Sequence, residues 1–140
     1  MVQSLLIVGS SIFVLMGAGH GVLTLKDLGN PRDFTPRDAK LRTAMQQSTI
    51  ALHPKINLWQ AWLGFNLSHS LGLVMFGGAF LYLGIFQSFL FSQSTLLQNL
   101  SILVSAAYLV MSLKFWFSIP AIGSGIALVC FVLAAALSYA

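Results

Sequence analysis

The charged residues of this chain are confined almost entirely to one short segment, and this confinement constrains the fold more than any other feature. All three acids and six of the seven Lys and Arg residues lie between Lys26 and Lys55, and Lys114 is the remaining charge. Residues 1–25, 56–113 and 115–140 therefore contain no Asp, Glu, Lys or Arg. A helix needs about 20 apolar residues to cross the roughly 30 Å hydrocarbon core of a bilayer. The uncharged stretches are long enough for this purpose.

The three uncharged stretches predict four transmembrane helices. The first and the last accommodate one helix each, and the middle one accommodates two because polar residues clustered between Gln87 and Thr95 predict a turn. We therefore expect an all-α fold, an integral membrane bundle of four transmembrane helices that forms a single domain over residues 1–140. The expected spans, joined by a first loop at 26–56, are 4–25, 57–85, 96–114 and 118–139.

The composition supports a membrane protein and argues against a soluble one. Apolar residues make up 57% of the chain and charged residues 7%, whereas a soluble domain has about 25% charged residues. The single cysteine, Cys130, has no second cysteine with which to form a disulfide or a zinc site. Residues 1–25 are interpreted as a span and not as a cleaved signal peptide, because no Lys or Arg precedes their apolar run.

The distribution of basic residues predicts the orientation of the chain in the membrane. Lys and Arg are enriched in short cytoplasmic loops, and here they lie in the first connection and at the inner end of the third span. We therefore expect loop 26–56 to be cytoplasmic and both termini to lie outside. The expected partners are the lipid bilayer and either other membrane subunits or a second copy of the chain. No aromatic-basic pattern indicates nucleic acid.

The first loop is long enough to contain structure of its own, and its sequence predicts a short interfacial helix between Thr35 and Leu52. Thr35 is a suitable N-cap, Pro36 suits the first helical position, and Asp38 follows three residues later as in a capping box. Apolar or small residues then recur at helical spacing up to Leu52, and His53-Pro54 is expected to end the helix.

Polar side chains within the predicted spans are the candidates for function, because they are costly to place at membrane depth. His20 lies about 9 Å from the inner end of span one, and Asn66 and His69 lie about 12 and 16 Å into span two. On a helical wheel Asn66, His69 and Ser70 share an arc of about 100°, and Trp62 extends the same face. His20, Asn66, His69, Ser70 and Trp62 are therefore the candidate ligand- or cofactor-binding residues, with His20 and Asn66 expected to meet.

Three hypotheses for function follow from this cluster. The first is a non-catalytic accessory subunit or a bundle that binds a small ligand. The second is a cofactor protein in which His20 and His69 ligate the iron of a haem or the magnesium of a chlorophyll-type pigment. The third is a membrane enzyme that acts on a lipid or a quinone with a histidine as general base. The third has the least support, because a base normally needs an orienting partner and only Asn66 and Ser70 are at hand.

Overall fold

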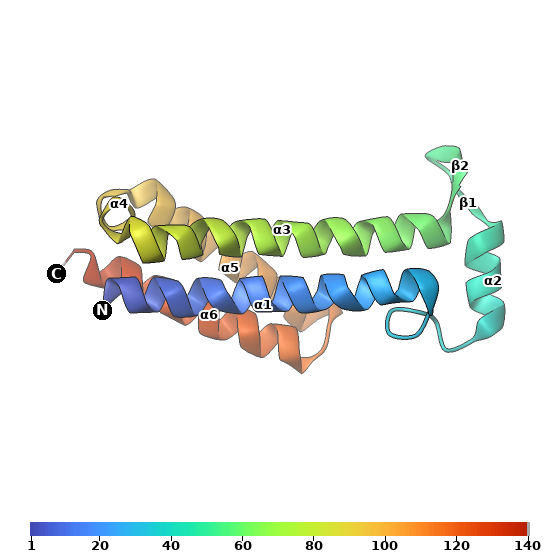
Figure 1. Ribbon diagram of the computed structural model, residues 1–140, viewed down its shortest axis with the longest axis horizontal. Coiled ribbons are helices and arrows are strands. Elements are labelled where there is room, and N and C mark those ends of the chain that lie inside the picture. The colour runs from blue at the N-terminus through green and yellow to red at the C-terminus, as the bar shows by residue number, and fades with distance from the viewer. Residues whose placement is uncertain (140) are drawn as a thin grey trace. The chain divides into compact units, whose positions relative to one another are not determined.

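The computed structural model describes residues 1–139 and shows an all-α protein with four helices long and apolar enough to cross a membrane (Figure 1). The multi-pass membrane fold predicted from the charge distribution is thereby confirmed. The four spanning helices are α1 (Val2–Gly29), α3 (Leu58–Phe86), α5 (Thr95–Phe115) and α6 (Ser118–Leu137). Large apolar side chains such as Leu15, Met75 and Leu103 are exposed on them, as helices surrounded by lipid require.

The helices differ most from the sequence-based expectation at the end of α1 and in the second connection. Helix α1 continues to Gly29 and so includes Asp27, which we had assigned to the loop. The polar turn expected between Gln87 and Thr95 contains a short helix, α4 (Ser88–Gln93). Ser94 then starts α5 as its N-cap, since its hydroxyl accepts the Leu97 N–H at 3.3 Å.

The residues group into two compact units. One comprises Met1–Met16 and the chain from Leu73 onward, and the other comprises Gly17–Gly72. Helices α1 and α3 each contribute to both units. The expected single domain over 1–140 stays a prediction.

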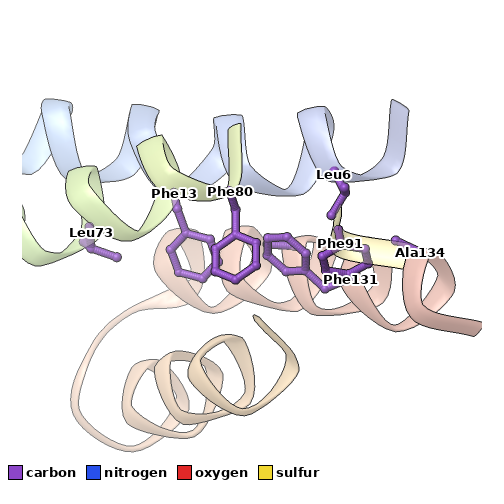
Figure 2. Packing of buried hydrophobic residues seen from close by; sticks show 8 residues of the cluster. Leu6, Phe13, Leu73, Phe80, Phe91, Phe131 and Ala134 are labelled. Carbon is purple, nitrogen blue, oxygen red and sulfur yellow. The ribbon is translucent and has the colours of Figure 1, made fainter. Parts of the chain in front are cut away.

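The first unit is built around a cluster of aromatic rings. Phe13 of α1, Phe80 of α3, Phe91 of α4 and Phe131 of α6 are buried together (Figure 2). The Phe80 ring meets Phe131 edge-on, with centroids 5.5 Å apart, and it meets Phe91 in the same way at 6.4 Å. Such edge-to-face pairs contribute about 0.5–1.5 kcal/mol each beyond the area they bury.

Small residues allow helices to approach closely in the same unit. Helices α5 and α6 pack against each other, and many of their buried residues are small, namely Ser101, Ser105, Ser112, Ser124, Ala127 and Ala134. Gly77 of α3 lies directly against α1. A Cβ atom at this position would be 2.7 Å from the Val14 nitrogen and 2.8 Å from the Ser10 carbonyl oxygen. Only glycine fits there without movement of the backbone.

The second unit holds the loop between α1 and α3, and it differs in detail from the prediction. Its short helix, α2 (Ala39–Gln47), begins three residues later than expected because Asp38, not Thr35, is the N-cap. The Asp38 carboxylate accepts the Lys40 N–H at 2.8 Å. The predicted N-cap at Thr35 was therefore wrong, and its hydroxyl has another partner described below. The interfacial position of α2 stays a prediction.

The helix was also predicted to extend to Leu52, and this was wrong. The chain after α2 forms a small antiparallel hairpin of β1 (Thr49–Ile50) and β2 (His53–Asn57). Thr49 and Ile50 are β-branched and favour extended backbone, and Pro54 excludes the helical conformation for His53. The hairpin leads directly into α3, whose first residue, Leu58, donates its N–H to the Ser48 carbonyl at 2.9 Å.

Candidate functional site

A hydrogen bond between a histidine and an asparagine joins α1 and α3 within the second unit. Nε2 of His20 lies 3.0 Å from Oδ1 of Asn66, and the Asn66 side chain is completely buried. This is the contact expected from the helical wheel and from the depths of the two residues. An interhelical bond of this kind contributes about 0.6–2 kcal/mol in a membrane.

The partners of Asn66 determine which nitrogen of His20 carries a proton. The Asn66 amide nitrogen donates to the backbone carbonyl of Trp62 at 2.8 Å. A carbonyl can only accept, so the amide oxygen must be the atom that faces His20. Nε2 of His20 is therefore the donor, and in the neutral ring Nδ1 is the acceptor. The asparagine thus selects one tautomer of the histidine.

His69 and two phenylalanines extend the cluster into a row of rings. The centroids of the His20 and His69 rings are 5.3 Å apart, in an edge-to-face arrangement. Phe34 contacts the His20 ring at 4.5 Å, and Phe65 is stacked near the His69 ring at 6.2 Å. The order of contacts is Phe34, His20, His69 and Phe65. Two imidazoles are thus flanked by two apolar rings.

The remaining candidates, Ser70 and Trp62, form hydrogen bonds to backbone carbonyls. The Ser70 hydroxyl donates to the Gly17 carbonyl, which ties α3 to α1. A Cβ atom at Gly21 would be only 2.5 Å from the Ser70 oxygen, so the helices approach closely there. The Trp62 indole N–H donates to the carbonyl of Phe34 at 2.9 Å. Ser70 and Trp62 therefore support the cluster from two sides.

Asp27 is a central residue of this unit that the sequence analysis missed. Its carboxylate is completely buried and accepts four hydrogen bonds from the loop that follows α1. Oδ1 accepts the backbone N–H groups of Arg32 and Asp33 at 2.8 and 2.9 Å. Oδ2 accepts the N–H of Phe34 at 2.7 Å and the hydroxyl of Thr35 at 3.0 Å. The loop is therefore folded around this carboxylate.

The position of Phe34 is fixed by hydrogen bonds to Asp27 and Trp62. Its N–H is held by Asp27, its carbonyl is held by Trp62, and its ring lies against His20. The signal for this arrangement was present in the sequence as an acid near the end of a helix, followed by Gly29, Asn30 and Pro31, which favour a tight return of the chain. From the sequence, Asp27 was counted only among the acids of the first loop.

The cluster has a limited capacity to hold a metal or a metallated cofactor. Among residues 1–139, no group of three or more His, Cys, Asp or Glu side chains is arranged to bind a metal ion. Axial ligation by Nε2 of His20 would require the loss of its bond to Asn66. Nε2 ligation by both histidines is thus not preformed, and the haem or chlorophyll hypothesis gains no support from the geometry.

In comparisons with known proteins, no family model, no curated protein and no solved structure matches this chain. The functional proposal therefore rests on the geometry of the second unit.

Proposed function

We propose that this protein is a small, non-catalytic integral membrane protein that binds a small ligand at the cluster of His20, Asn66 and His69. The single observation that carries the proposal is the fixed hydrogen bond between His20 and Asn66. It holds one imidazole in a defined tautomer beside a second imidazole at 5.3 Å. A bond that served helix packing alone would not need a second histidine at its side.

The environment of the two imidazoles indicates the chemistry of the ligand. Phe34 and Phe65 flank them, and an ionised group at membrane depth costs about 2.5–3.5 kcal/mol even on the mildest scale. The ligand that suits this row is neutral, flat or partly apolar, and carries a group that hydrogen-bonds to imidazole. Gly19 and Gly64 leave open space near the two histidines in the sequence, since a Cβ atom at either position would meet nothing within 4 Å.

The hydrogen bonds of the buried Asp27 carboxylate support a non-catalytic role. An imidazole that acts as a general base is normally oriented by a carboxylate. Both oxygens of Asp27 accept hydrogen bonds from the loop 32–35, so this carboxylate is committed to the loop. The cluster therefore suits binding better than proton transfer. An accessory subunit that presents the ligand to another membrane protein, or to a second copy of the chain, fits the same description.

We propose the orientation given by the positive-inside rule for the same protein. The six basic residues between Lys26 and Lys55 support a cytoplasmic position of the loop between α1 and α3, with both termini outside. The cluster then lies in the cytoplasmic half of the membrane.

Purification in mild detergent, followed by native mass spectrometry and absorption spectroscopy, tests the proposal. We expect one small molecule per chain to co-purify with the wild-type protein and to be lost from His69→Leu and Asn66→Leu. Ser68→Ala is the matched control, because Ser68 is exposed on α3 and donates only to the Phe65 carbonyl. Equal retention by all variants, or no co-purifying molecule in the wild type, contradicts ligand binding. A visible absorption band that His69→Leu abolishes would instead support the cofactor hypothesis.

A further inference from the structure

A pocket of about 370 Å³ lies where α1 ends, apart from the histidine cluster. It belongs entirely to the second unit, and the function proposed above does not use it. Its lining combines one apolar side chain with three charged residues and two turn residues. These are Leu25, Lys26, Gly29, Asn30, Arg32 and Asp33.

The charges of the lining favour a ligand with a single negative charge. Lys26 and Arg32 contribute two positive charges and Asp33 one negative charge, which leaves a net charge of +1. Asp27 also carries a negative charge, but its carboxylate is buried and its oxygens accept hydrogen bonds from the loop, so a ligand in the pocket meets the charges of the lining directly. Arginine and lysine are the side chains that bind phosphate oxygens.

The backbone that carries two of these charges is fixed before any ligand binds. The N–H groups of Arg32 and Asp33 donate to Oδ1 of Asp27 at 2.8 and 2.9 Å. Lys26, which also lines the pocket, belongs to the last turn of α1, and its carbonyl accepts the N–H of Asn30 at 2.8 Å. A preorganised loop loses less conformational entropy on binding, which favours affinity.

The charge distribution of the sequence indicates that the pocket lies at the level of lipid headgroups. Lys26 is the first charged residue after the uncharged stretch 1–25, so it marks the point where the helix leaves the hydrocarbon core. Leu25 adds an apolar contact at the same edge. Basic residues in this position attract anionic lipids of the cytoplasmic leaflet.

We propose that this pocket binds the phosphodiester of a membrane phospholipid, with the phosphate between Lys26 and Arg32. A phosphodiester carries one negative charge and matches the net charge of the lining. Asp33 at the same pocket disfavours inorganic phosphate, which carries a larger negative charge. The acyl chains of the lipid would follow the apolar surface of α1 beyond Leu25.

Native mass spectrometry of the full chain in detergent, with added dioleoylphosphatidylglycerol, tests this proposal. We expect a one-lipid adduct in the wild type, and at least about a tenfold weaker adduct in the double variant Lys26→Gln/Arg32→Gln. The matched control is Arg37→Gln/Lys40→Gln, which removes the same charge from exposed residues outside the pocket. Dioleoylglycerol, which has the same acyl chains and no phosphate, should bind far less.

Two further measurements keep the test decisive if the double variant folds poorly. Asp33→Asn should strengthen the adduct severalfold, because it removes the negative charge of the lining and leaves the backbone N–H in place. Lys26→Arg should retain the adduct. The proposal is overturned if both double variants lose lipid equally, if Asp33→Asn has no effect, or if dioleoylglycerol binds as well as the phospholipid. Displacement of the lipid by millimolar inorganic phosphate would assign the pocket to a soluble phosphate and would contradict the proposal of a lipid site.

Discussion

The backbone N–H of Phe34 donates to the buried carboxylate of Asp27 at 2.7 Å, which joins a loop residue to the helix seven positions earlier. The same residue accepts the indole N–H of Trp62 through its carbonyl, and its ring contacts His20. A single loop residue thus connects the last turns of α1, the first turns of α3 and the histidine cluster. The order of the loop and the environment of His20 are therefore coupled.

Asp27→Asn should loosen the loop 30–35. An asparagine keeps one acceptor oxygen, but its NH2 group replaces the other oxygen and cannot accept hydrogen bonds. About half of the four hydrogen bonds would therefore be lost. Hydrogen bonds to a charged group contribute about 1.5–3 kcal/mol each, so the loss of two should lower the free energy of local opening by about 3–6 kcal/mol. Amide hydrogen exchange at Phe34, measured on the detergent-solubilised protein, reports this opening directly.

Asp33→Asn is the control for this prediction. It makes the same change of charge in the same loop, but the Asp33 side chain is exposed and its backbone N–H, which donates to Asp27, remains. Exchange at Phe34 should be unchanged. If the two variants accelerate exchange equally, the buried carboxylate does not hold the loop.

The spanning helices could be predicted because the sequence encodes them over long distances. Stretches of 25 or more residues without a charge determine a membrane span by solvation alone, with no knowledge of packing. The loop was harder, because its structure depends on single contacts. Thr35 and Asp38 both suit an N-cap, and the choice between them was decided by Asp27, which engages the Thr35 hydroxyl.

Solvation also made part of the histidine cluster predictable. His20 and Asn66 are polar residues within apolar helices, and lipid cannot satisfy them, so a contact between them follows from depth and helical phase. The contribution of Phe34 could not be found in this way. Its place depends on the three-dimensional path of a short loop, and an apolar residue in a loop gives no periodic signal.

Gly77→Ala should destabilise the first unit, whereas Gly78→Ala should not. A Cβ atom at Gly77 would clash with the backbone of α1, and overpacking of this kind costs about 1–3 kcal/mol. A Cβ atom at Gly78 would meet nothing within 4 Å, and alanine is the better helix former by about 1 kcal/mol. Unfolding in sodium dodecyl sulphate, followed by circular dichroism, measures both. Equal stability of the two variants would contradict the close approach of α3 to α1.

Cysteine labelling should place the first loop in the cytoplasm. In a Cys130→Ser background, an impermeant thiol reagent added to intact cells should label Gln93→Cys and leave Lys40→Cys unlabelled. Both positions are exposed, so accessibility to water does not distinguish them. After lysis Lys40→Cys should react as well. Labelling of Lys40→Cys from outside intact cells would reverse the proposed orientation.

A double-mutant cycle on His20 and Asn66 should give a coupling free energy of about 0.6–2 kcal/mol, the value expected for an interhelical hydrogen bond in a membrane. Asn66→Leu leaves the Nε2–H of His20 without its acceptor, and His20→Leu leaves the amide oxygen of Asn66 without its donor. The stability losses of the two single variants should therefore add up to more than the loss measured for the double variant. Unfolding in sodium dodecyl sulphate supplies the four free energies.

The same cycle with His69 in place of Asn66 separates packing from hydrogen bonding at this site. His20 and His69 meet through their rings, so His69→Leu keeps an apolar contact and should couple to His20→Leu more weakly than Asn66→Leu does.

His20→Gln separates the hydrogen bond from the ring of His20, because its amide can donate to Asn66 as the imidazole does but has no ring to place against Phe34. It should recover stability lost in His20→Leu while failing to restore ligand retention. If His20→Gln restores both, the ring of His20 has no part in binding, and the hydrogen bond alone accounts for the cluster.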